Sequence, residues 1–489
     1  MSSPLKDAAI SGAHAPPRQK RAQVSKACQR CKKLQKGCSE SRPCQRCIRV
    51  GLEEQCVQNA GQSQQPVDTN WSYPQLPASL SPETFHATPF ATVSPQPSLP
   101  PTSVIGYCFQ RFFAKLYPTI PILSPEYAEM LVVEAGSSHG DEAQCLITAV
   151  CAVILIQVEE SDQRLFEGDG IPHSNSDFGK LLFEEAMVAH HHLSSRFNPC
   201  LERALATFFL YAGHASLFHH SQAFYFLRDT ATLWQVLRVD EGDALRRELA
   251  DRLFWVTLVS ERSHGIRYRR PVTLQVTPSG PDIDATADTD TSLAGLRSLV
   301  ALFRPLDTAF FALLNQEDTV FAPRLLSPLD ALQTAIGSAL EQQHDRVLCE
   351  TQLSNLTVTQ LWLLVILWQV RLRLGLLVEE TGMPCHLTFH YPVEVGGELA
   401  GVIRAISLDS IRVHGVGINE KIFDVACAMV DVLSRVPATD KSGAGLENIK
   451  YFRRLIHQLP GGVSTYDALL DKHISNVLPN VLGNPGLQR

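Results

Sequence analysis

Residues 28–56 read CQRCKKLQKGCSESRPCQRCIRVGLEEQC and contain six of the thirteen cysteines in this chain of 489 residues. A Cys-x2-Cys pair supplies two thiolates to one tetrahedral zinc ion, and two such pairs of matching spacing are a strong zinc signal. The stretch contains the tetrapeptide Cys-Gln-Arg-Cys twice. It therefore predicts a metal site whose ligands are Cys28, Cys31, Cys38, Cys44, Cys47 and Cys56.

The number of metal ions follows from the ligand count. Six thiolates either complete one four-cysteine site with two thiols left over, or complete two tetrahedral shells if two of them bridge. The repeated tetrapeptide favours two similar halves, each with a short helix and a loop that returns a third cysteine. We predict two Zn²⁺ ions, bridged by the equivalent residues Cys28 and Cys44. The alternatives are a disulfide scaffold and a structural zinc knob that does not bind nucleic acid.

The thiols are expected in a reducing compartment, because residues 1–17 lack the apolar core of a secretory signal. Charge is divided unevenly along the chain. Residues 1–60 contain twelve Lys and Arg against four Asp and Glu, whereas the remaining chain contains 31 against 46. A basic head joined to an acidic body suits nucleic-acid binding, because Lys and Arg neutralise phosphates and release counterions.

The spacing C-x2-C-x6-C-x5-C-x2-C-x8-C, with Ala27, Pro43 and Gly51-Leu52 around it, resembles the fungal binuclear zinc cluster (Zn2Cys6) transcription factors. The resemblance implies a small two-helix cluster that binds double-stranded DNA in the nucleus. It also implies a regulator of RNA polymerase II promoters that works with the transcription machinery or co-regulators. Zinc would then be structural, and no enzymatic activity is expected. A reading from another class is a zinc-headed nuclear protein-interaction module without direct base reading.

The first helix of the cluster is expected at about residues 26–36, with Gly37 as its C-cap. Its surface is uniformly basic, so we place it in the major groove and expect backbone contacts from the second half. The resemblance puts base-reading basic residues three positions before the third cysteine and directly before it. Here these positions hold Gln35 and Gly37, so a half-site that departs from CGG is expected. The predicted DNA-contacting residues are Arg30, Lys32, Lys33, Gln35, Lys36, Arg46 and Arg49.

Composition divides the chain into five segments. The basic run at residues 16–21 lies in the arm and suits nuclear import, a phosphate contact or a solvated tail. The linker is rich in Pro, Ser and Gln and cannot bury a core. It shows no heptads, so the isolated head is expected to be a monomer and any homodimer to depend on the helical domain. The segments are an arm (1–24), the cluster (25–60), the linker (61–104), an all-helical regulatory domain (105–478) and a tail (479–489).

The body is predicted to be all-α, without βαβ alternation or hairpins. The runs 149–156 and 361–368 are apolar all round but too short to cross a bilayer, so we expect them in central core helices and expect no membrane contact. Apolar residues recur at helical spacing in four segments: residues 201–211, 224–239, 245–262 and 422–436.

Phrases of the body extend the resemblance to the regulatory middle homology region of the same factors. They are FAKLYPTIPIL (113–123), the helix that ends in LRVD (237–240) and RLFWVTLVSER (252–262). They imply an all-helical domain that controls activity. The sequence leaves open a small-molecule effector cavity between its helices but does not locate one. The segment 261–274 faintly resembles regulators of sugar utilisation.

Enzyme and metal readings of the body find little support. The run His190–His192 forms no His-x3-His pair, and consecutive histidines on a helix point in different directions. The sequence contains no Walker loop, no Gly-x-Ser-x-Gly elbow and no Gly-x-Gly-x-x-Gly. The aromatic residues Phe208, Phe209, Phe218, Phe224 and Tyr225 are expected in the core rather than in a cofactor site.

Overall fold

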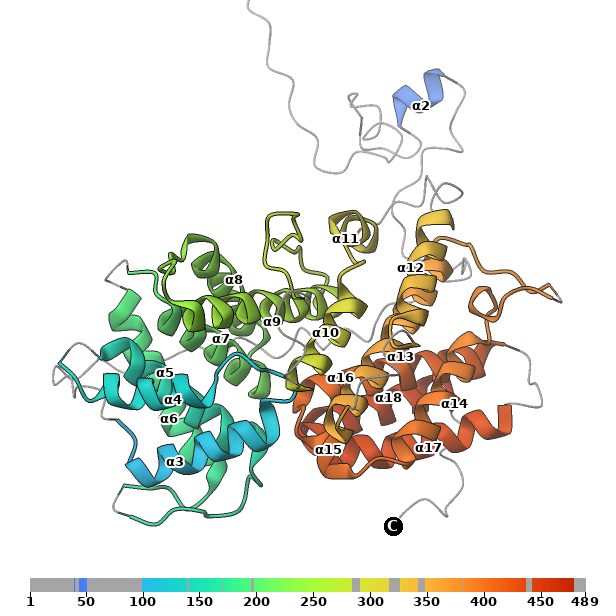
Figure 1. The fold of residues 1–489 in the computed structure, drawn as a ribbon. Helices are drawn as coiled ribbons and strands as arrows, with labels where there is room; N and C mark the ends of the chain where they lie inside the picture. The colour runs from blue at the N-terminus through green and yellow to red at the C-terminus, as the bar shows by residue number, and fades with distance from the viewer. Residues whose placement is uncertain are drawn as a thin grey trace, which may run out of the picture. The chain divides into compact units, whose positions relative to one another are not determined.

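The computed structural model describes residues 39, 44–50, 99–138, 140–168, 170–194, 198–283, 291–315, 326–341, 348–380, 382–436 and 442–478. The chain divides into two compact units, residues 1–70 and 71–489. In the first unit the structure describes one helix, α2 (Gln45–Arg49). The regular structure of the described residues is helical throughout, which confirms the all-α prediction for the body (Figure 1).

The second unit is built from helices of 5 to 25 residues. Short π-helical turns extend α3 at Phe112–Leu116 and α5 at Ile154–Val158, and another precedes α18 at Gly462–Tyr466. The helices are α3 (Thr102–Arg111), α4 (Pro125–Ala135), α5 (Asp141–Val153), α6 (Asn175–Ser194), α7 (Leu201–Ser216), α8 (His220–Val236), α9 (Ala244–Tyr268), α10 (Thr291–Phe303), α11 (Thr308–Asn315), α12 (Leu326–Ser338), α13 (Glu350–Arg373), α14 (Tyr391–Arg404), α15 (Leu408–Arg412), α16 (Val416–Arg435), α17 (Ser442–Gln458) and α18 (Asp467–Val477).

The helices predicted from periodicity are confirmed as α7, α8, α9 and α16, with changes at their ends. Helix α8 ends at Val236, three residues earlier than predicted, because Leu237 takes an extended conformation. Tyr225 on this helix is 65% exposed, so its predicted place in the core is wrong. Helix α9 begins at an Asp243 cap that accepts from Arg246 N (3.0 Å). Helix α3 begins at Thr102, so the helical body starts within the last residues of the predicted linker.

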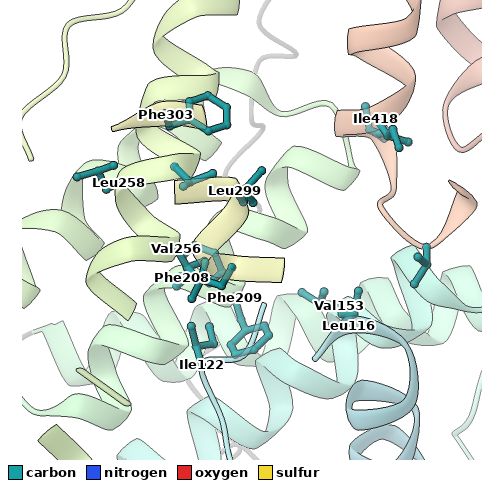
Figure 2. Packing of buried hydrophobic residues seen from close by; sticks show 14 of the residues in the cluster. Leu116, Ile122, Val153, Phe208, Phe209, Val256, Leu258, Leu299, Phe303 and Ile418 are labelled. Atoms are coloured by element: carbon teal, nitrogen blue, oxygen red, sulfur yellow. The ribbon is translucent and has the colours of Figure 1, made fainter. Parts of the chain in front are cut away.

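Two groups of helices meet through α9 and α10. Helices α5, α6, α7 and α8 pack against one another, and so do α13, α14, α16 and α17. Helix α9 packs on α8 and α10, and α10 packs on α13, so these two helices join the groups (Figure 1). Figure 2 shows part of the core at this junction, where Phe208 and Phe209 of α7 lie near Val256 of α9 and Leu299 of α10.

The apolar runs lie in core helices, as predicted. The segments Asp141–Val158 and Glu350–Arg373 are long and apolar enough to cross a membrane by length and composition alone, and α10 with α11 forms a bent pair that passes the same test. Most of each long segment is buried within the protein. Trp362 and Trp368 of α13 are among the largest fully buried side chains. Burial against other helices accounts for this hydrophobicity.

Candidate functional site

The described part of the zinc head places two predicted ligands on one helical turn. Cys44 is the N-cap of α2, and its carbonyl accepts from Cys47 N (2.9 Å) and Ile48 N (3.1 Å). Ser39 Oγ accepts from Gln45 N at 3.0 Å and so satisfies another amide at the start of this helix. Cys44 and Cys47 thus lie three residues apart on one helical turn, a spacing that puts both side chains on the same face.

Burial on α2 fits a metal-centred core. Cys44 and Cys47 are fully buried, whereas Ile48 and Val50 are 48% and 53% exposed. The buried side chains of this described segment are therefore its two cysteines, whereas its aliphatic side chains are exposed. This donor set fits Zn²⁺, which prefers thiolates in closed structural sites.

The predicted DNA-contacting residues fall into two sets. Arg46 and Arg49 are exposed on α2, which confirms that a helix carries both side chains. The other predicted ligands and contacts lie outside the described residues, as does the helix expected at 26–36. They are Cys28, Cys31, Cys38 and Cys56 with Arg30, Lys32, Lys33, Gln35 and Lys36.

The histidine run of α6 is divided between the interior and the surface of the helical body. His190 is buried on α6 with its Nε2 3.0 Å from Thr207 Oγ1, while His191 and His192 are exposed on the same helix. Burial lowers the pKa of His190 to about 4, which keeps the ring neutral. Within the described ranges, no three His, Cys, Asp or Glu side chains are grouped so as to hold a metal ion.

A buried ion network joins α9 to α16 in the helical body. Arg267 of α9 forms ion pairs with Glu420 (3.3 Å) and Asp424, and its Nη1 also donates to Glu420 O at 3.1 Å. Tyr268 and Tyr466 donate their hydroxyls to Glu420 Oε1 at 2.7 and 2.6 Å. The network therefore ties two helices that lie about 150 residues apart in the chain.

The two carboxylates of this network have different environments. Burial raises the pKa of Glu420, but Arg267 and the two tyrosine hydroxyls outweigh it, so the net shift is downward. Burial raises the pKa of Asp424 above its usual range despite Arg267 and a hydrogen bond from Trp362 Nε1 at 3.0 Å. Because both side chains lie in the interior, their charges depend on Arg267.

The segment 261–274 fixes the turn that follows α9. Arg269 is left-handed (φ 53°) and ends the helix. The Glu261 carboxylate then accepts from Thr273 N and Leu274 N, both at 2.9 Å, and pairs with Arg228 at 2.8 Å. The stretch that resembles regulators of sugar utilisation thus forms this turn and also supplies the cation of the buried network.

A cavity of about 160 Å³ lies where α7, α9, α10, α13 and α16 meet, and we call it the central cavity. Leu116, Val256, Leu299 and Ile418, which Figure 2 labels on different elements, form part of its apolar wall. Its polar lining includes Thr119, Gln157, Ser263, Asn355, His414 and Lys421.

Lys421 gives the central cavity its charge. Its Nζ donates to Thr359 Oγ1 (2.8 Å) and lies 5.6 Å from the centre of the Trp362 ring. Burial lowers the pKa of Lys421 to about 8, although neighbouring Glu420 raises it. Lys421 forms no ion pair with any residue that the structure describes.

A larger cleft of about 630 Å³, the outer cleft, adjoins the central cavity. It is lined by residues of the Ile154–Val158 turn, by Arg111 and Arg412, and by residues 457–463. Gln157 and Val413 line both spaces, so they form the wall between them.

The Gln157 side chain is held at both ends of its amide. Its Nε2 donates to Val413 O at 3.1 Å, and its Oε1 accepts from Ser216 Oγ at 3.1 Å. Gly415 has φ +64°, and a Cβ there would lie 2.9 Å from Gln157 Cγ. Position 415 therefore requires a glycine, because any other residue would be strained at this φ and its Cβ would collide with the Gln157 side chain.

Comparison with known proteins gives one distant relative. No family model matches the chain. The chain is 22% identical over 361 residues to a Candida albicans protein named probable sucrose utilization protein SUC1, and the match covers 72% of this chain and 68% of the relative. A match of this length is far longer than residues 1–104, so it includes much of the helical body.

Proposed function

We propose that this chain is a nuclear, sequence-specific DNA-binding regulator of RNA polymerase II promoters. One observation carries the proposal: the six-cysteine spacing, with Cys44 and Cys47 buried on a helix that exposes Arg46 and Arg49. The helical body would control activity and contact co-regulators or a second copy of the chain. The relative's name and the faint resemblance of residues 261–274 together favour genes of sugar utilisation as targets.

In this proposal two Zn²⁺ ions hold the head together and take no part in a reaction. The residues that would hold them are the six cysteines, with Cys28 and Cys44 bridging. When bound, the ions supply folding free energy that so short a segment cannot obtain from hydrophobic burial. The DNA contacts would come from the basic side chains around them.

Site selection from random DNA with the full chain tests base reading at Gln35. Glutamine can both donate and accept, which suits adenine, whereas lysine offers only donors, which suits guanine N7 and O6. We expect a wild-type half-site that departs from CGG, and a shift toward guanine in Gln35→Lys of about 1–3 kcal/mol. Identical motifs from both proteins would show that Gln35 reads no base.

Salt dependence separates base readers from phosphate contacts. Lys32→Ala or Lys33→Ala should weaken binding to all sequences and reduce the slope of log K against log salt by about one. Lys180→Ala on α6 is the matched control, because its exposed side chain pairs, among the residues that the structure describes, only with Asp177. The control should leave the slope unchanged.

The second candidate function is the zinc-headed interaction module. It retains the zinc requirement but predicts no steep salt dependence of DNA binding. Chelation should abolish specific DNA binding of the regulator. A chain that binds a protein partner and shows only weak DNA binding, unaffected by chelation, would favour the module.

A further inference from the structure

We propose that the central cavity binds a small organic monocarboxylate, with the carboxylate at Lys421 and Asn355 and the apolar part against Val256, Leu299 and Ile418. The binding itself requires nothing of the zinc head. Its use as a signal rests on the proposed function, since the ligand would then act on a DNA-binding regulator.

The charge of the lining favours an anion. Among the described residues that line the cavity, only Lys421 is charged, because burial holds the pKa of His414 at about 4 and leaves that ring neutral. An ammonium carries three hydrogens, and one is donated to Thr359. A buried cation that no carboxylate of the described residues neutralises is costly, and an anionic ligand removes that cost.

The nearby carboxylates form no ion pair with Lys421 among the described residues. Glu420 precedes it on α16 but pairs with Arg267 and accepts two tyrosine hydroxyls. Asp424, one turn further on, pairs with the same arginine and accepts from Trp362. The buried network thus engages the two acids of α16 that lie within one turn of Lys421, and the ammonium lines the cavity.

Asn355 and Thr119 supply further polar groups. Asn355 Oδ1 accepts from Thr359 Oγ1 at 3.3 Å, and its amide NH₂ has no hydrogen-bond partner among the described residues. Lys421 and Asn355 therefore meet at Thr359, which leaves an ammonium and an amide beside each other. Thr119 Oγ1 is buried in the cavity wall without a hydrogen-bond partner in the described structure.

Size and polarity narrow the ligand class. A cavity near 150 Å³ holds a molecule the size of benzene, so 160 Å³ suits roughly six to ten non-hydrogen atoms. The aliphatic wall accommodates an apolar chain, and a single ammonium balances only one negative charge. A short aliphatic monocarboxylate meets these conditions better than a dianion or an amine.

Calorimetric titration and thermal unfolding of the zinc-loaded full chain, without DNA, test the proposal. The probes are 4-methylpentanoate, the neutral 4-methylpentanamide and the cationic 4-methylpentylamine. We expect the carboxylate to raise the melting temperature saturably and to bind at least about tenfold more tightly than the amide, since charged hydrogen bonds are the stronger ones. The amine should not bind.

Two variants and a control locate the site. Lys421→Met removes the charge and should weaken 4-methylpentanoate binding about tenfold or more, whereas Lys472→Met on the exposed side of α18 should not. Ser263→Leu fills the cavity without touching Lys421, so it should also weaken binding and serves if the first variant folds poorly.

Several results would overturn the proposal. They are a carboxylate that fails to bind, an amide that binds equally well, and unchanged binding in both Lys421→Met and Ser263→Leu. Since these measurements use no DNA, a failure here leaves the proposed function standing. A head that binds no DNA would likewise leave the binding result intact.

Discussion

Replacing Arg267 by Met should strongly destabilise the helical body. The substitution keeps an unbranched side chain but leaves Glu420 and Asp424 buried without their common cation. Removing one partner of a buried ion pair costs about 3–5 kcal/mol, and here one cation serves two carboxylates. The loss is a large part of the 5–15 kcal/mol by which proteins are usually stable.

The dependence on pH gives a second signature of the same variant. Without the arginine, burial should raise the pKa of both carboxyls above their values in the unfolded chain. A carboxyl with a raised folded pKa binds a proton more readily in the folded state, so the variant should regain stability as pH falls from 7 toward 5. Wild type should show a smaller recovery, because Arg267 keeps the pKa of Glu420 lowered and only that of Asp424 is raised.

Urea unfolding, followed by circular dichroism and tryptophan fluorescence, measures the effect. The triple variant Arg267→Met, Glu420→Gln, Asp424→Asn has no buried charge at this position and should recover most of the loss. Arg412→Met breaks a surface pair with Glu160 (3.0 Å) and should cost less than about 1 kcal/mol. A loss below about 1 kcal/mol in Arg267→Met, or no recovery in the triple variant, would refute this account of the network.

Three further predictions concern the head, the cavity wall and a buried histidine. Metal analysis should return two zinc ions per chain, and Cys44→Ala should disrupt both sites because the thiolate bridges them; one zinc in the wild type would contradict this. Gly415→Ala should cost about 1–3 kcal/mol in urea unfolding, because alanine is strained at φ +64° and its methyl group meets Gln157; an unchanged midpoint would be the contrary result. Burial lowers the pKa of His414 to about 4, so the free energy of unfolding should fall as pH drops from about 6.5 to 4, by up to about 1.4 kcal/mol per pH unit. The fall should be less steep in His414→Gln. Equal slopes in the two proteins would exclude this role of His414.

Periodicity was enough to locate helices whose apolar faces are regular. Helix α16 has apolar residues at helical spacing from Ile422 onward, and the structure confirms it. Helix α9 was found as well, but its buried charges were not, because Glu261 and Arg262 resemble a solvated face when only the sequence is read. The all-α class can be predicted from the hydrophobic pattern alone, whereas the buried charges can be identified only from the packing of the helices.

The central cavity could not be predicted from the sequence for a different reason. Its lining comes from segments between residues 116 and 421, and no local motif links Gln157 to Lys421. A lysine between two buried apolar helical positions, Ile418 and Ile422, was the one available signal. By contrast, the zinc ligands lie within 29 residues, where spacing alone carries the information.

The two hydrogen bonds of Gln157 set how often the wall between the outer cleft and the central cavity is open. Each is worth about 0.5–1.5 kcal/mol net, so a side chain that must leave both is out of place only about 1–20% of the time. A molecule that arrives through the outer cleft would find the passage blocked by Gln157 most of the time. A molecule inside the central cavity would leave through the same passage equally rarely. Arrival and departure slow by the same factor, so the equilibrium is unchanged. A wall that is open about 1–20% of the time slows exchange with the outer cleft by roughly five- to a hundredfold relative to a permanently open one.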